Sequence, residues 1–268
     1  MLGIRTVIPL SGCNVTQRRQ IELGLAETVL LAAHARDHIL RWSNESEIYR
    51  KYFGNSPSME DIGAYEVVVS GDKNGILFRS DNPDGNCDID GWAGHWRGEN
   101  DTEQTVICDL SYQARRSLAT MCAIGYTVSE FGTNTFWASD LLHRLYHLPS
   151  IDQEWVNHHA DGYGEVLNLA NQHPMLSTHD LATLQYFALE QVARRLIVIL
   201  TLEVSFIATE AVNFDAMTGE SRQASRSTQD VWTFQVTHSH FLSSLLRLTA
   251  FEMFGITILS IQPMYQCL

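Results

Sequence analysis

Apolar residues recur at helical spacing over several long segments of the chain. Residues 16–42 have the pattern of one long amphipathic helix, with Asn14 or Thr16 available as its N-cap. Similar spacing predicts short helices over residues 49–53 and 59–70, and a later helix over residues 180–195. The first 195 residues are therefore expected to be mainly helical.

Three shorter segments, bounded by glycine-rich or polar turns, have the composition of strands. They cover residues 76–79, 91–98 and 103–110. A further helix, expected over residues 136–147, follows them. We therefore expect an α+β fold that is mainly helical, with a small antiparallel or mixed sheet ahead of that helix.

The composition of the sequence changes after about residue 190. An apolar run over residues 196–208 is interrupted by Glu203, so it is too short and too charged for a membrane span. Residues 214–230 have the composition of a linker. The sequence predicts a truncated leader or disordered segment over residues 1–12, a folded domain over 13–195, and a divergent, poorly ordered C-terminal appendage over 196–268.

The net charge of the chain disfavours some classes of binding partner. The chain has 18 Lys and Arg against 31 Asp and Glu, a net charge of −13, which disfavours nucleic acid and anionic membranes as partners. Three N-glycosylation sequons begin at Asn14, Asn44 and Asn100. These sequons favour an extracellular or cell-surface glycoprotein, although residues 1–12 do not form a complete signal peptide.

Five cysteines are too scattered for a C-x-x-C zinc site, so disulfides in an oxidising compartment are expected. The pairing stays open at this stage. Cys13 is expected either to pair with Cys267 or to have no partner, and Cys108 to pair with Cys122 or Cys87.

The main chemical signal is a pair of histidines, His143 and His147, on the helix expected over residues 136–147. A spacing of four residues puts both imidazoles on one helix face, where they can bind a single zinc ion. A zincin motif has glutamate directly after the first histidine as general base, but this chain has Arg144 there. Because a guanidinium cannot accept a proton, zinc is predicted and hydrolysis stays open. Two histidines bordering a polar cleft without metal are the alternative.

Carboxylates near the pair offer two further roles. Asp140 is expected on the histidine face, and Asp140, Glu154 or Glu165 can serve as a surrogate base; alternatively, Asp140 forms an ordinary ion pair with Arg144. Asp161 is the candidate third ligand because it lies 14 residues after His147, and His159 competes with it.

Three other groups of residues are expected to have no chemical role. His34 and His38 have the same spacing as the pair above, but no acidic third ligand follows them. The two imidazoles of His238-Ser239-His240 lie near no cysteine or carboxylate in the sequence. An aromatic set is expected to pack in the core behind the metal site: Trp92, His95, Trp96 and Trp137.

Several segments around the histidine pair together resemble a known family. They are residues 70–79, 84–87, the G-W-A-G-H-W run at 91–96, the V-I-C-D-L-S-Y run at 106–112, and N-T-F-W-A-S-D-L-L-H-R-L-Y-H at 134–147. On these segments the chain resembles the fungal peptidase family named for its H-R-x-x-H motif. That family is similar to the deuterolysin-like zinc proteases and to fungal pH-regulated surface antigens.

The resemblance implies a zincin-like fold and a Zn²⁺ site formed by His143, His147 and Asp161. It also implies that Tyr163 stabilises an oxyanion. Asp140 and Arg144, named above from their positions, complete the candidate catalytic set with Tyr163. Two functions follow from it. The first is a secreted zinc metalloendopeptidase, or a homologue of one, with a peptide or protein substrate. The second is a non-catalytic zinc-binding surface protein that scavenges metal or binds a partner.

Overall fold

The computed structural model describes residues 8–194, 248–253 and 256–261. The chain divides into two compact units, Met1–Arg195 with Gln266–Leu268, and Leu196–Tyr265. In the second unit, the described residues form one antiparallel pair of strands, β5 Leu248–Met253 and β6 Ile256–Ile261. The apolar run, the linker and His238 to His240, all named from the sequence, lie outside the described residues.

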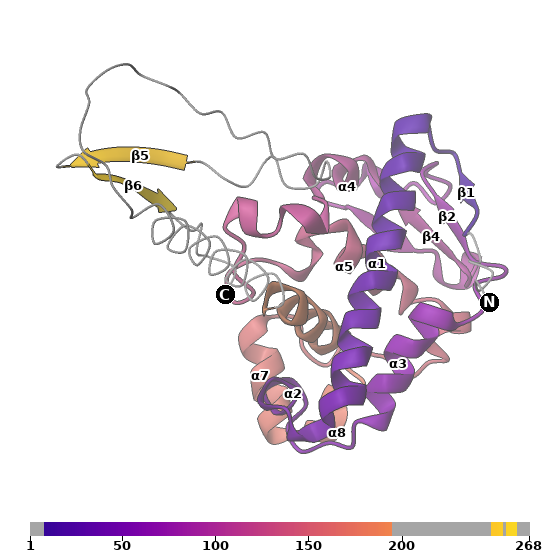
Figure 1. Cartoon of the computed structure of the whole chain (residues 1–268). Coiled ribbons are helices and arrows are strands. Elements are labelled where there is room, and N and C mark those ends of the chain that lie inside the picture. The colour runs from indigo at the N-terminus through magenta and orange to yellow at the C-terminus, as the bar shows by residue number, and fades with distance from the viewer. Residues whose placement is uncertain (1–7, 195–247, 254–255, 262–268) are drawn as a thin grey trace, which may run out of the picture. The chain divides into compact units, whose positions relative to one another are not determined.

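The first unit is organised around one long helix, α1 Val15–Trp42, as the sequence predicts. The side chain of Asn14 accepts a hydrogen bond from the Gln17 backbone, and the Gln17 side chain bonds back to the Asn14 backbone, which forms a capping box. Helix α1 runs alongside α3 Met59–Ser70 and α5 Trp137–Leu145 (Figure 1). The long helix is thus the support against which the histidine helix packs.

Gly24 allows α1 and α5 to approach closely. A Cβ atom at this position would lie 2.8 Å from Leu141 Cδ1 and 2.9 Å from Trp137 Cβ. One turn further along α1, the hydroxyl of Thr28 donates to the backbone carbonyl of Ala138 at 3.0 Å. Close approach and this hydrogen bond together fix α5 against α1.

The predicted helices are confirmed at residues 16–42, 49–53 and 59–70, and a helix spans residues 181–194 where 180–195 was predicted. The other helices are short: α2 Glu47–Phe53, α4 Asp109–Ala114, α6 Pro149–Asp152, α7 Tyr163–Gln172 and α8 Pro174–Ser177. Within the described part of the chain, no helix combines the length and the apolar composition that a membrane span requires.

The sheet of the first unit is mixed and has the strand order β1-β2-β4-β3. Strands β1 Leu10–Ser11, β2 Leu77–Arg79 and β4 Gln104–Ile107 are parallel, and β3 Gly94–Trp96 pairs antiparallel with β4 at the edge. Strand β1 lies in the segment predicted to be leader or disordered, so the last residues of that segment belong to the sheet. The predicted fold class, α+β and mainly helical with a small mixed sheet, is confirmed.

A cluster of aromatic rings forms the core between α2, α3 and the helix of residues 181–194. Phe187 lies at its centre, with ring centroids 5.1 Å from Phe53 and 6.1 Å from Tyr52. Two of the neighbouring tyrosines bond to the last helix: Tyr65 donates to the Leu184 carbonyl at 2.7 Å, and Tyr52 donates to Glu190. This core holds the last helix in place, and that helix in turn supplies a partner to the histidine site.

One disulfide joins described residues, between Cys87 and Cys108. It is one of the two pairings expected for Cys108, and the other, with Cys122, is wrong. Cys13 is a free thiol whose sulfur lies 2.9 Å from the hydroxyl oxygen of Ser80. The alternative in which Cys13 has no disulfide partner is therefore confirmed, and its pairing with Cys267 is wrong.

Candidate metal centre

Helix α5 runs through the protein interior instead of along its surface. Eight of its nine residues are buried, and His143 is the exception. Asp140, which the sequence placed on the histidine face of the helix, is buried against two arginines. Its carboxylate accepts hydrogen bonds from Arg144 Nε at 2.8 Å and from Arg115 Nε at 3.1 Å.

Arg144 faces the sheet. Its guanidinium donates to Asp140, to the Val106 carbonyl at 3.0 Å and to the Ala93 carbonyl at 3.2 Å, and only 7% of the side chain is exposed. The ion pair of Asp140 with Arg144, the simpler alternative from the sequence, is therefore confirmed. Arg144 fastens α5 to β4 and to the residue that precedes β3, so it orients the helix that carries His143. The helix predicted over residues 136–147 spans Trp137–Leu145, and His147 lies in the turn that follows it.

Gly94 makes room for this guanidinium. A Cβ atom on Gly94 would lie 2.3 Å from Arg144 Nη1 and 2.3 Å from the Val106 carbonyl oxygen. We expect Gly94→Ala to displace Arg144 and to lower the free energy of unfolding by about 1–3 kcal/mol, as overpacking does. Urea unfolding measures this effect, with Gly132→Ala as the matched control, because a Cβ on Gly132 meets nothing within 4 Å. Equal stability of the two variants would contradict the close packing described here.

Three histidine side chains converge beside α5. The Nε2 atom of His147 lies 3.1 Å from that of His143 and 3.3 Å from that of His158. Two nitrogens bound to a tetrahedral zinc ion at 2.0–2.1 Å are about 3.3 Å apart. The observed separations match this geometry, so the residues fit a zinc ion. No carboxylate oxygen of the described residues joins the cluster.

Gln185, from the helix of residues 181–194, orients the first histidine. The amide nitrogen of Gln185 donates to Asn134 Oδ1 and to the Ser139 carbonyl, both at 2.8 Å. Its amide oxygen then faces His143 Nδ1 at 3.4 Å and accepts the ring proton. The lone pair of His143 Nε2 is left facing the other two histidines, as metal binding requires.

Burial keeps two of the imidazoles neutral. Loss of solvation, followed by the nearby charges of His147 and Arg144, lowers the pKa of His143 to about 3. Burial also lowers the pKa of His147 to about 4, with smaller contributions from His158 and Arg144. Neutral imidazole is the form that binds metal, so these two ligands are ready at neutral pH.

The same pKa shifts predict how pH affects the metal-free protein. Histidine in the unfolded chain has a pKa of about 6.5. Folded His143 and His147 have a pKa of about 3 and about 4, so between pH 6.5 and 4 the unfolded state binds more protons. The free energy of unfolding should therefore fall on acidification, by on the order of 3 kcal/mol at pH 4 for each of the two histidines. Urea unfolding across this range tests it, and a His143→Gln, His147→Gln variant with the same pH slope as the wild type would refute it.

His158 reaches the cluster through an unusual turn after α6. Gln153 and Glu154 both have positive φ, 53° and 62°, a left-handed backbone conformation that is uncommon for residues other than glycine. His158 also meets a carboxylate on its outer side, since its Nδ1 lies 3.7 Å from Asp161 Oδ1. The structure therefore brings His143 and His147 together as predicted, adds His158, and places Asp161 behind His158 with 89% of its side chain exposed. His159 is not part of the cluster.

The other proposed site residues lie apart from one another. Tyr163 begins α7, and its ring lies 5.5 Å from that of Tyr186 and 5.4 Å from Lys51 Nζ. Glu165 accepts a hydrogen bond from the Asp161 backbone at 3.0 Å, so it supports the loop behind His158. These contacts of Tyr163 and Glu165 therefore do not bring either side chain to the three Nε2 atoms of the histidine cluster.

Aromatic side chains border the cluster on the side of the sheet. The Trp96 ring is nearly parallel to that of His147, at a centroid distance of 6.4 Å. Trp96 and Trp92 are 39% and 41% exposed, so the prediction that both pack in the core is wrong. Trp137 is buried in the core as predicted.

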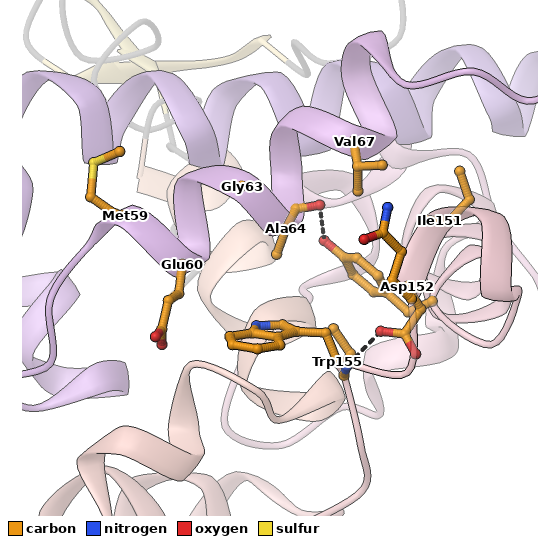
Figure 2. A pocket seen from close by; sticks show the side chains of 11 residues that line it. Met59, Glu60, Gly63, Ala64, Val67, Ile151, Asp152 and Trp155 are labelled. Carbon is orange, nitrogen blue, oxygen red and sulfur yellow. Dashed lines mark hydrogen bonds between the residues drawn. The ribbon is translucent and has the colours of Figure 1, made fainter.

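A separate pocket of about 320 Å³ lies between α3 and the segment after the histidine helix (Figure 2). Glu60, Asp152 and Trp155 give it two carboxylates and an indole ring, and none of the three clustered histidines lines it. The Tyr146 hydroxyl crosses to α3 and donates to the Ala64 carbonyl at 3.1 Å (Figure 2). Tyr146 directly precedes His147, and Trp155 lies three residues before His158. The same chain segment therefore borders both the pocket and the histidine cluster.

Residues 5–199 match the sequence model of the HRXXH family, described as a putative peptidase family. The chain is 64% identical over 192 residues to the major allergen Asp f 2 of Aspergillus fumigatus, a match that covers 71% of this chain and 62% of that protein. It is 61% identical over 188 residues to antigen 1 of Emericella nidulans, covering 70% and 68% of the two chains.

Two more distant likenesses extend the comparison. The pH-regulated antigen PRA1 of Candida albicans is 51% identical over 181 residues, covering 67% of this chain and 60% of that protein. A solved zinc peptidase from Grifola frondosa superposes with a TM-score of 0.48 at 14% identity, over 66% of this chain and 96% of the peptidase.

Proposed function

Because the chain belongs to the HRXXH putative peptidase family, we propose that it is a zinc-binding metallopeptidase homologue. In this proposal the zinc ligands are His143, His147 and His158. One observation carries it: the three Nε2 atoms converge at separations of 3.1 and 3.3 Å, which suit one tetrahedral ion. Asp161, the third ligand expected from the resemblance, is not a ligand in this proposal and lies on the outer side of His158.

The outer partners of the ligands support this assignment. Histidines that bind metal donate their second ring N–H to a carboxylate or an amide oxygen, which fixes the ring and raises its basicity. Gln185 has this place on His143. The Asp161 carboxylate lies 3.7 Å from Nδ1 of His158, on the corresponding side of that ring but beyond hydrogen-bond distance. Arg144 acts on the site through α5, as a positioning residue, because its guanidinium is engaged by Asp140 and the sheet.

Peptide hydrolysis is the second candidate function, favoured by the number of ligands. Three protein ligands leave a fourth position for water or substrate, as in catalytic zinc sites. Bound there, zinc supplies a Lewis acid that polarises a peptide carbonyl and makes a water molecule more acidic. Asp161 precedes α7 and Glu165 lies in the first turn of that helix, so both carboxylates follow His158 closely in the chain and are the candidate bases for this function.

Incubation of zinc-loaded protein with casein separates the two functions. Cleavage that stops with a chelator, returns with zinc and is absent from a His143→Ala, His147→Ala variant supports hydrolysis. Stoichiometric zinc binding without any cleavage supports a binding protein and excludes the protease. Failure to bind zinc at all would overturn both.

We also propose an extracellular or cell-surface location. Relatives of this chain are named antigens and an allergen, and the disulfide between Cys87 and Cys108 suits an oxidising compartment. Glycosylation at Asn14, Asn44 or Asn100 belongs to the same proposal. A shift in mass after enzymatic deglycosylation of the secreted protein tests it.

A further inference from the structure

We propose a second metal site, formed by Cys87, His95 and Cys108, that is closed while the two cysteines form their disulfide and opens when they are reduced. One ring nitrogen of His95 and the two sulfur atoms all lie within 4.8 Å of one another. Two thiolates and an imidazole are a ligand set that zinc prefers. In the oxidised protein both sulfurs are bonded to each other in the disulfide and cannot bind the metal as thiolates.

The state of His95 points to a missing ligand. Its Nε2 lies 3.1 Å from Asp84 Oδ2, and because a carboxylate only accepts, Nε2 of the neutral ring carries the proton. Its Nδ1 is then a lone-pair acceptor. This atom is buried and has no hydrogen-bond partner, although only 7% of the side chain is exposed. A buried acceptor without a partner is costly, and a metal ion or a thiol would satisfy it.

Asp84 gives His95 the outer partner that metal-binding histidines usually have. Its carboxylate also accepts hydrogen bonds from Arg97 Nε at 2.9 Å and Nη2 at 3.0 Å. The arginine fixes the carboxylate, and the carboxylate fixes the imidazole ring. The ligand geometry is therefore set before any metal arrives.

Three separate elements place the ligands. Cys87 lies in the 3-10 turn η2 Asn86–Asp88, His95 in β3, and Cys108 directly before α4. The Cα atoms of the two cysteines are 5.4 Å apart. Two sulfurs bound to zinc at 2.3 Å lie about 3.8 Å apart. After reduction, side-chain rotation and small backbone adjustments in these segments therefore have to separate the two sulfurs to this distance.

The chemistry balances with an external thiol as reductant. Two thiols transfer two electrons and two protons to the Cys87–Cys108 disulfide, giving two cysteine thiols and one external disulfide. Zinc binding then releases both thiol protons, and His95 binds as neutral imidazole. In reverse, an external disulfide takes two electrons from the two thiolates and two protons from solvent, re-forming the Cys87–Cys108 bond and freeing the metal.

Cobalt(II) titration of the full-length protein tests the site, with a phosphine as reductant so that no added thiol binds metal. Thiolate ligands give cobalt an intense charge-transfer absorption that histidines alone do not give. This readout therefore does not depend on His143, His147 and His158, and the two proposals fail separately. We expect the absorption in reduced protein within two equivalents of cobalt, because the histidine site takes up cobalt as well, and its absence in oxidised protein.

Matched variants identify the ligands. Cys87→Ser with Cys108→Ser should abolish the absorption, and His95→Gln should weaken cobalt binding at least tenfold, whereas His173→Gln should leave both unchanged. The proposal is overturned if reduced, folded protein shows no thiolate absorption, or if His95→Gln binds as tightly as the wild type. If reduction unfolds the chain, circular dichroism of a His143→Ala, His147→Ala variant replaces the titration, because that variant lacks the first site. Zinc should restore its fold, and failure to do so overturns the proposal.

Discussion

Replacing Arg144 with glutamate should strongly destabilise the domain instead of restoring a zincin active site. The change places a second carboxylate beside Asp140 and removes the guanidinium bonds to the Val106 and Ala93 carbonyls. Breaking a buried ion pair by removing one partner typically costs about 3–5 kcal/mol. Urea unfolding should show a loss of this size, together with loss of zinc binding where the domain no longer folds.

Two further variants serve as controls for the Arg144→Glu experiment. Arg19→Glu is the control, because Arg19 is exposed on α1 and its replacement should change stability by less than about 0.5 kcal/mol. Arg144→Lys keeps the charge but loses the planar set of donors, so an intermediate loss is expected. The role of Arg144 in fastening α5 to the sheet would be contradicted if Arg144→Glu were as stable as the wild type and cleaved casein.

Zinc should stabilise the folded protein strongly. Any ligand that binds only the native state adds RT ln(1 + [L]/Kd), which is about 4 kcal/mol at a free concentration a thousand times the Kd. Thermal unfolding of metal-free protein with and without zinc measures this stabilisation. It should vanish in a His143→Ala, His147→Ala variant, since both Nε2 atoms that face the ion are gone.

A second histidine pair provides the matched control for that experiment. His34 and His38 have the same spacing of four residues, but His38 Nε2 bonds to the Ser46 hydroxyl at 2.7 Å. A His34→Ala, His38→Ala variant should therefore keep the full zinc-dependent shift. Loss of the shift in this variant, with the His143 and His147 pair intact, would place the zinc elsewhere in the chain.

Local pattern was enough to predict most of the framework. Helix boundaries followed from apolar periodicity and capping, so α1 and α3 begin and end close to the predicted residues. The histidine pair was equally visible, because a spacing of four residues brings two side chains to one helix face, and the turn after Leu145 keeps His147 beside His143. The family resemblance strengthened the expectation of zinc.

The rest of the site depends on contacts that are distant in sequence. Periodicity on α5 could not reveal that Asp140 is buried, because its partner Arg115 comes from a separate segment. His158 was missed because two consecutive positive φ values, at Gln153 and Glu154, direct the loop, and neither residue type signals such a turn. A sign of its role was nonetheless present, since His158 lies three residues before Asp161 in the segment considered for the third ligand.

The zinc content of four purified proteins tests the central assignment most directly: wild type, His158→Ala, His159→Ala and Asp161→Ala. His159 adjoins His158 but lies outside the cluster, so it is the control for local disturbance. We predict one zinc per chain in the wild type and in His159→Ala, a weakened site in Asp161→Ala, and almost none in His158→Ala. A full equivalent of zinc in His158→Ala, with none in Asp161→Ala, would contradict the site described here and restore Asp161 as the third ligand.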